Sequence, residues 1–162
     1  MFSDFLSKRK AERQLSKLLK AVDVGELSSA PKIKSGRIDF IFTLLRADTP
    51  EQLSDAMSVV TNAAKIYGAI VFDVAGPLII MAIGTHGPVE GSSVLRAKLV
   101  ADVHQRLGTN VKTVHGVADG HFGLFGNKTR INYTFTFDCF ETALATLIQI
   151  QFGKVQEIMT KQ

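Results

Sequence analysis

Three histidines and one aspartate are the first residues that could do chemistry, because imidazole and carboxylate groups bind zinc and carry protons. His115 and His121 flank Asp119, and His86 lies in the segment GTHGP. They have neither the cysteine partners nor the close spacing typical of a zinc site. We therefore predict no metal site here, and we interpret these side chains as ordinary loop and strand-end histidines.

No arrangement of nucleophile, histidine and acid is visible elsewhere. Asp102 and His104 are two residues apart on one expected helix, so they do not share a helix face. Cys139 is the only cysteine, which excludes an internal disulfide and a cysteine-based zinc site. We interpret it as a small apolar side chain at the start of a helix, in a protein of a reducing, cytoplasmic compartment.

The segment GHFGLFGNKT approaches a phosphate-binding loop but does not meet its requirements. Asn127 interrupts the Gly-Lys pair that such a loop needs, and a strand follows it instead of a helix. Phe122 and Phe125 also suggest the stacking aromatics of an RNA-binding strand. Because they are three residues apart, they point to opposite faces of a strand and cannot form one stacking platform.

The charge of the chain is concentrated at its beginning. The 162 residues carry a net charge of +4, and residues 2–22 alone account for +6 − 2 = +4. The body is therefore balanced, and we predict no nucleic-acid partner, since such binding needs a basic face on the folded domain. No segment is expected to span a membrane, because the most apolar stretch contains Asp73 and is broken by Gly76 and Pro77.

Residues 1–35 are predicted to form a basic N-terminal helix and a linker, and residues 36–162 one domain. The apolar residues of the helix follow helical spacing. Three interpretations stay open for it: packing on its own domain or on a sister helix, contact with an anionic membrane surface, or a solvated arm.

The order of elements in the body predicts an α+β fold. Thr49, Pro50 and Gly68 have the residue types that begin and end a helix, and Gly76-Pro77 is suited to a hairpin turn. The expected helices are 48–68, 92–108 and 139 to beyond Ile158, and the expected strands are 37–45, 69–75, 78–83, 111–118, 121–126 and 131–137. This order favours a ferredoxin-like fold, in which helices cover one face of a mainly antiparallel sheet.

Two segments of the body carry a family resemblance. KIYGAIVFDVAGPLIIMAIG ends a helix and forms a hairpin, and GLFGNKTRINYTFTFD holds the glycines Gly123 and Gly126 and the pair Tyr133-Thr134. In this order they resemble the catalytic domain of class III adenylate and guanylate cyclases, over roughly residues 36–150. The resemblance implies a nucleotide-cyclase fold and a homodimer.

The residues at the family's catalytic positions differ from the family pattern. The two metal-binding aspartates of the family correspond to Leu44 and Pro77, and neither side chain can coordinate Mg²⁺. The asparagine and arginine that stabilise the reacting nucleotide correspond to Glu141 and Ala145. Removing one such preorganised charge stabiliser typically costs about 10²- to 10³-fold in rate.

Asp138 matches the position at which the family reads the purine base, and it is our one candidate nucleotide-binding residue. Its family partner is a lysine, and that position holds Asp73 here. Two facing aspartates would repel each other or share a proton. Asp138 is also a good residue type for the N-cap of the following helix.

The sequence thus predicts a catalytically degenerate, cyclase-like domain that acts in signalling or scaffolding through dimerisation and contacts with another protein. No metal or cofactor is expected. Two alternatives stay open. One is an active cyclase with a rearranged metal site, built from Asp39 or Asp48 together with Asp73. The other is a sensor that binds a nucleotide without turning it over.

Overall fold

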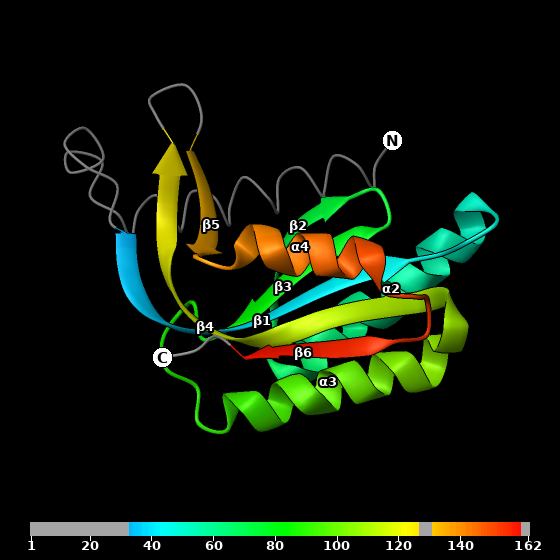
Figure 1. Ribbon diagram of the computed structural model, residues 1–162, viewed down its shortest axis with the longest axis horizontal. Coiled ribbons are helices and arrows are strands. Elements are labelled where there is room, and N and C mark those ends of the chain that lie inside the picture. Colours follow the sequence, from blue (N-terminus) through cyan, green and yellow to red (C-terminus); the bar gives the residue numbers. More distant parts are fainter. Residues whose placement is uncertain (1–32, 127–130, 160–162) are drawn as a thin grey trace, which may run out of the picture.

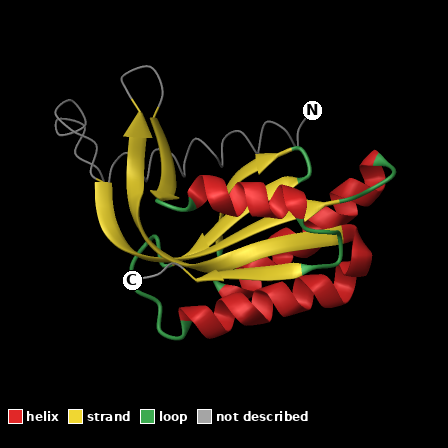
Figure 2. Cartoon of the chain, in the orientation of Figure 1, coloured by secondary structure: helices red, strands yellow, loops and turns green. Residues whose placement is uncertain are grey.

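The computed structural model describes residues 33–126 and 131–159. Its elements are β1 (Ile33–Leu45), α2 (Pro50–Tyr67), β2 (Ile70–Ala75), β3 (Leu78–Ile83), α3 (Ser92–Leu107), the short 3-10 helix η1 (Gly108–Asn110), β4 (Val111–Gly126), β5 (Ile131–Phe137), α4 (Phe140–Gln149) and β6 (Val155–Met159). Figures 1 and 2 show them as one twisted sheet with helices on both sides.

The strands form one sheet in the order β2-β3-β1-β4-β5, and every neighbouring pair along this path is antiparallel. β6 pairs with the same edge of β4 as β5 does, but it pairs with an earlier part of β4. The pairing of β6 with β4 is parallel. The first four strands with α2 and α3 reproduce the ferredoxin-like order, so the predicted fold class is confirmed.

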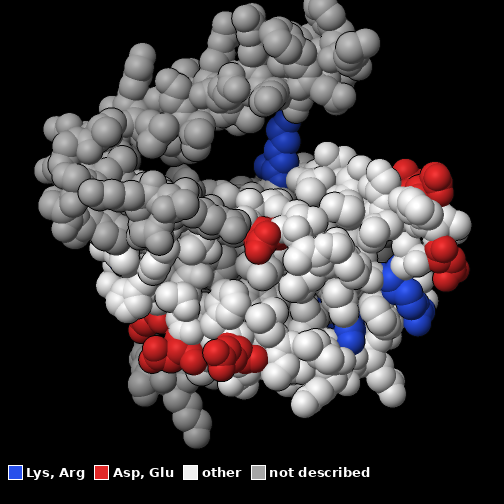
Figure 3. All heavy atoms as spheres, turned by 90° about the horizontal axis from the view of Figure 1, so that it is seen from above, with Lys and Arg blue, Asp and Glu red and all other residues white. Residues whose placement is uncertain are grey.

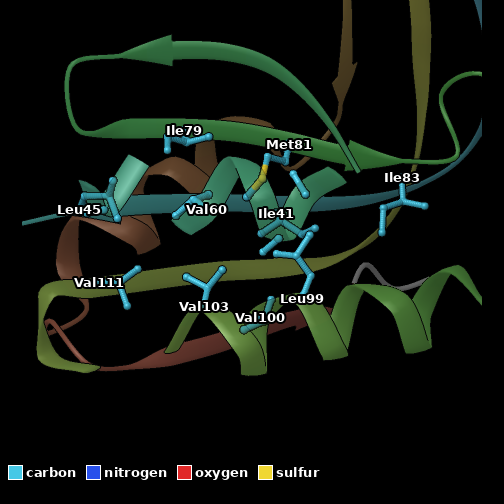
Figure 4. Close-up of a cluster of buried hydrophobic side chains, with 13 residues drawn as sticks. Ile41, Leu45, Val60, Ile79, Met81, Ile83, Leu99, Val100, Val103 and Val111 are labelled. Carbon is cyan, nitrogen blue, oxygen red and sulfur yellow. The ribbon is translucent and has the colours of Figure 1, made fainter. Parts of the chain in front are cut away.

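Helices α2 and α3 cover one face of the sheet. A cluster of buried aliphatic side chains fills the space between them, from β1, β3, β4 and both helices (Figure 4). Ile41, Met81 and Val60 at its centre are 0% exposed. Residues on one face of a strand alternate with those on the other, which is why Ile41 and Leu45 of β1 both belong to this cluster.

The opposite face of the sheet is covered by α4. The prediction that the helices cover only one face is therefore wrong. The reason is the second apolar face of β1, where Phe40 and Phe42 also need cover. Phe40 stacks on Phe137 of β5 with ring centroids 4.5 Å apart, and Phe42 meets the edge of Phe140 of α4 at 4.9 Å. Such aromatic contacts add roughly 0.5–1.5 kcal/mol each beyond burial.

The predicted ends of α2 are confirmed. The Thr49 hydroxyl accepts a hydrogen bond from the Gln52 amide at 3.2 Å, and Pro50 occupies the first turn. Gly68 ends the helix with φ of +74°, in the left-handed region that glycine enters without a steric penalty. The predicted hairpin turn at Gly76-Pro77 is also present, between β2 and β3.

β4 is one strand of 16 residues, whereas the sequence suggested two strands separated near Asp119-Gly120. β1 pairs with β4 along its whole length, from Ile33 opposite Gly123 to Leu45 opposite Val111. This continuous pairing overrides the local turn signal. A Cβ atom on Gly120 would lie 2.4 Å from the carbonyl oxygen of Thr136, so the glycine serves the close approach of β5 and not a turn.

The final helix is shorter than predicted. It ends at Gln149, and the segment that was expected to continue it to Ile158 forms β6. Gly153, with φ of +86°, lies in the turn between them. The helical spacing of apolar residues across this break is a coincidence, since Ile158 instead packs against the aromatic cluster.

The start of β1 lies three residues before the predicted domain boundary at residue 36, because Ile33 already pairs with β4. The predicted N-terminal helix lies outside the described residues. Among the described residues, no helix combines the length and the apolar character needed to cross a membrane.

Candidate functional site

The end of β1 and the turn between β2 and β3 lie side by side. Leu44 is paired with Leu78, and the Leu45 amide donates a hydrogen bond to the Pro77 carbonyl oxygen at 2.9 Å. The two positions that the resemblance assigns to metal-binding aspartates are therefore neighbours. Their side chains are an aliphatic chain and a pyrrolidine ring, which offer no oxygen or nitrogen atom to a cation.

A hollow of about 520 Å³ opens beside this pair, and its lining includes Leu45, Arg46, Asp48, Pro77 and Phe152. Asp48 is the one acidic residue in that lining, and it is exposed. A single exposed carboxylate is a weak ligand set for Mg²⁺, which is usually held by one or two carboxylates together with substrate phosphates.

The cationic side chains near the hollow already have partners. The guanidinium of Arg46 lies 4.7 Å above the ring centroid of Phe152, and the ammonium of Lys112 lies 4.9 Å from the same centroid. Arg46 also donates to the Thr109 carbonyl oxygen at 2.9 Å. Lys112 donates to the carbonyl oxygens of Ile148 and Ile150, and so binds the C-terminal end of α4.

Glu141 and Ala145 lie one turn apart on α4, and both are exposed. The helix thus presents a carboxylate and a methyl group at the two positions where the family has an amide and a guanidinium. Neither side chain can donate a hydrogen bond to a phosphate at neutral pH.

Asp138 is exposed in the turn between β5 and α4. The N-cap of α4 is Cys139, half-buried and without a capping side-chain hydrogen bond, so the N-cap interpretation of Asp138 is wrong by one residue. The Cys139 carbonyl oxygen accepts the first helical bond, from Ala143. The assignment of Asp138 as a nucleotide contact stays a prediction.

Asp73 is exposed on the edge strand β2, directly after a bulge that adds Phe72 to the strand. The Phe72 ring stacks on Tyr133 of β5 at 5.9 Å and meets the edge of Phe135 at 4.9 Å. The aromatic cluster thus links β2 with β5, the strand that leads into Asp138. The pairing of Asp73 with Asp138 that the resemblance implies stays a prediction.

Tyr133 has a structural role at this position. Its hydroxyl donates to the Thr85 carbonyl oxygen at 2.7 Å, and its ring lies 4.8 Å from that of His86. Burial raises the pKa of the Tyr133 phenol and lowers that of the His86 imidazole, because it disfavours the charged form of each.

Asp39 and Asp73 do not come together, so the rearranged metal site built on that pair is not formed. Strand β3 lies between β1 and β2. Asp39 is 2% exposed and accepts hydrogen bonds from Ser92, Ser93 and Arg96 of α3. Its carboxylate is committed to these donors, and it lies on the α3 side of the sheet.

The histidines considered as metal ligands are dispersed. His115 is buried in β4, His121 is hydrogen-bonded to the Ser35 hydroxyl at 2.9 Å, and His86 packs on Tyr133. Across residues 33–126 and 131–159, no group of three or more histidine, cysteine or acidic residues could hold a metal ion. Phe122 lies in the core and does not form a stacking surface.

Two groups of interacting residues were not predicted from the sequence. One is the ion-pair network of Asp39, Arg96 and Glu157, and the other is Phe152 between Arg46 and Lys112. Each joins residues more than 35 positions apart, so no local pattern announces it. The nearest signal is the pair of serines at the start of α3, a residue type that often binds carboxylates.

No protein-family model and no curated protein matches the chain. Solved structures do. The guanylate cyclase domain of RhGC from Catenaria anguillulae in complex with GTP matches with a TM-score of 0.64 and 12% identity, over 76% of this chain and 79% of that one. The adenylyl cyclase CyaB from P. aeruginosa matches with a TM-score of 0.59 and 14% identity, over 76% and 77%.

A dimeric guanylyl cyclase domain of the RhoGC fusion protein from Blastocladiella emersonii matches with a TM-score of 0.60 and 13% identity, over 76% of this chain and 80% of that one. The chain spans about half the length of the bacterial light-regulated adenylyl cyclases that it also matches, 51% and 56%. At such identities the likeness concerns the fold, and the chain has the fold of the adenylyl and guanylyl cyclase catalytic domains.

Proposed function

We propose that this chain is a non-catalytic, cyclase-like domain that acts in signalling or scaffolding through its contacts with a second copy and with another protein. The observation that carries the proposal is the pair Leu44 and Pro77. They adjoin one another as a two-ligand site requires, yet neither can bind a cation. Without metal ions, the attacking hydroxyl keeps its high pKa and the triphosphate charge is not neutralised.

Glu141 and Ala145 support the same conclusion for the other half of the site. The carboxylate of Glu141 would repel a polyphosphate, and Ala145 supplies no charge. In the family, each site combines the metal aspartates of one chain with the asparagine and arginine of the other. Because this chain departs from the pattern in both halves, neither a second copy nor an intact partner could complete a site with it.

The surface available for protein contacts is the face that carries α4. Seen from above, this face is broad and mostly uncharged (Figure 3). Ile148 on the outer side of α4 is 72% exposed, and Ala145, one turn earlier, is exposed as well. Exposed apolar side chains on a surface with few charges are typical of protein interfaces.

The dimer is tested by sedimentation velocity on the wild type and on the variant Ile148→Lys. We expect the wild type to sediment as a dimer at micromolar concentration and Ile148→Lys to shift the population to monomer, because a buried lysine would lack a partner. Ile66→Lys, also at an exposed isoleucine but on α2, is the matched control and should leave the dimer intact. A wild type that stays monomeric, or equal sedimentation of both variants, contradicts this assignment of the surface.

Catalysis is tested separately, by measuring cyclic nucleotide formation from ATP and from GTP with Mg²⁺ or Mn²⁺. The proposal predicts no product above the background without enzyme. Product that depends on protein and metal would show that the chain is an active cyclase.

A further inference from the structure

A buried ionic network lies between the sheet and α3, on the face opposite α4. Asp39 of β1 accepts hydrogen bonds from the Ser92 hydroxyl at 2.6 Å, the Ser93 hydroxyl at 3.1 Å and the Arg96 guanidinium at 2.9 Å. Asp39 and Arg96 are 2% and 5% exposed. The carboxylate therefore fixes the first turn of α3, which has Gly91 at its N-cap and no capping side-chain bond.

Arg96 extends the network to the C-terminal strand. Its second terminal nitrogen donates to Glu157 of β6 at 2.8 Å, and the Glu157 side chain is 48% exposed. β6 is a short edge strand whose five residues pair with β4 in parallel. This ion pair adds a side-chain interaction to the backbone pairing that holds β6 on β4.

His115 of β4 lies opposite Glu157 in the pairing of the two strands. It is 7% exposed, and its Nδ1 atom has no hydrogen-bond partner among the described residues. The Nε atom of Arg96 has none among them either. Leaving a buried polar atom unpaired is costly, because the atom loses its hydrogen bonds to water and gains none in the protein. Opening β6 would hydrate these atoms, so the cost of displacing the strand is reduced here.

The charged and titratable groups around His115 come from every element packed on it. Asp39 faces it from β1, Arg96 and His104 from α3, and Glu157 from β6. Burial lowers the pKa of His115, and the positive charge of Arg96 lowers it further, against smaller opposite effects of Glu157 and Asp39. Burial and the charge of Arg96 thus both disfavour the protonated form of His115 in the folded chain.

We propose that β6 is a proton-sensitive strap, which leaves β4 when His115 takes up a proton. A protonated ring needs water or a new partner, while Asp39 already accepts three hydrogen bonds and the Oε1 atom of Glu157 accepts one from Arg96. Release of β6 gives the ring water. It also leaves the backbone groups of β4 between Thr113 and Val117 without their partner strand.

The experiment is hydrogen–deuterium exchange of the full chain at pH 7.5, 6.5 and 5.5, with each rate corrected for the intrinsic exchange rate at that pH. Peptides that cover β6 and residues 113–117 should lose protection between pH 6.5 and 5.5, by up to about tenfold per pH unit for one proton. Peptides from α2 should not.

Three variants separate the possible causes. His115→Gln should abolish the pH dependence of β6 exchange, because the titrating group is gone. His104→Gln is the matched control in the same cluster and should keep it. Glu157→Gln should raise β6 exchange at every pH, since the ion pair to Arg96 is weakened.

The proposal that β6 is a proton-sensitive strap is refuted if β6 exchange in the wild type is independent of pH. It is also refuted if the pH dependence persists in His115→Gln. Should His115→Gln fail to fold by circular dichroism, the wild type still decides. A nuclear magnetic resonance titration must then show the His115 ring and the β6 amides changing at the same pH, and changes at different pH values refute the coupling. Neither measurement depends on whether the chain binds a nucleotide.

Discussion

At the scale of single residues, the side chain at a position decides what a shared fold can do there. Leu44 and Pro77 lie beside each other, held by the pairing of β1 with β3 and by the hydrogen bond from Leu45 to Pro77. Neither side chain carries an oxygen or nitrogen atom that could bind a metal ion. On α4, Glu141 and Ala145 lie one turn apart and present a carboxylate and a methyl group.

Asp39 is the acidic residue whose loss should matter most for stability. Asp39→Ala removes the carboxylate that holds Ser92, Ser93 and Arg96, and it leaves the Arg96 charge buried without its main partner. We expect a loss of about 3–5 kcal/mol in the free energy of unfolding. Urea denaturation measures it, and Asp48→Ala at an exposed position should cost less than about 0.5 kcal/mol. Equal effects of the two substitutions would contradict this role.

The lowered pKa values of three histidines predict how the stability of the folded chain depends on pH. Burial is the main cause that lowers the pKa of His86, His104 and His115 in the folded chain. The unfolded chain, with histidine pKa values near 6.5, therefore binds more protons in mild acid. The stability they contribute is complete above about pH 6.5 and is lost as the pH falls below it. Urea midpoints at pH 7.5 and 5.5 test this, and a midpoint that rises on acidification would refute it.

At the scale of elements, local signals predicted well where local chemistry decides. Thr49, Pro50 and Gly68 gave the correct ends of α2, because capping and the left-handed turn are properties of a few neighbouring residues. Gly76-Pro77 gave the hairpin for the same reason.

The errors occurred where distant partners decide. Asp119-Gly120 suggested a turn, but β1 pairs across it and makes β4 continuous. Apolar spacing extended α4 to Ile158, although Gly153 already marked a break. The buried pair of Asp39 and Arg96 could not be predicted, because its residues are 57 positions apart and neither has a local motif.

The close parallel pairing of β6 with β4 depends on Gly116. A Cβ atom at this position would lie 2.1 Å from the Ile158 carbonyl oxygen and 3.0 Å from the Phe40 ring. We expect Gly116→Ala to displace β6 and to lower the free energy of unfolding by about 1–3 kcal/mol. In Gly36→Ala the new Cβ would meet only the movable Phe122 ring, at 3.2 Å, so this control should lose less. Thermal unfolding measures the stability of both variants. A Gly116→Ala protein more stable than Gly36→Ala would show that β6 is less closely packed on Gly116.

At the scale of the whole molecule, the two faces of the sheet have separate roles. The α2–α3 face holds the aliphatic core and the ion-pair network, and the α4 face holds the aromatic cluster and the mostly uncharged surface (Figures 3 and 4). The proposed function assigns protein contacts to the α4 face.

Calorimetric titration tests the proposed loss of the metal-dependent nucleotide site most directly. The purified chain is titrated with ATP and GTP analogues, each with Mg²⁺, with Mn²⁺ and with EDTA. We expect no heat of binding under any of these conditions, because the side chains of Leu44 and Pro77 offer no metal ligands and Glu141 repels phosphates. Binding that is equal with and without metal would instead indicate a nucleotide sensor that uses Asp138. Micromolar binding that requires Mg²⁺ or Mn²⁺ would contradict the central claim.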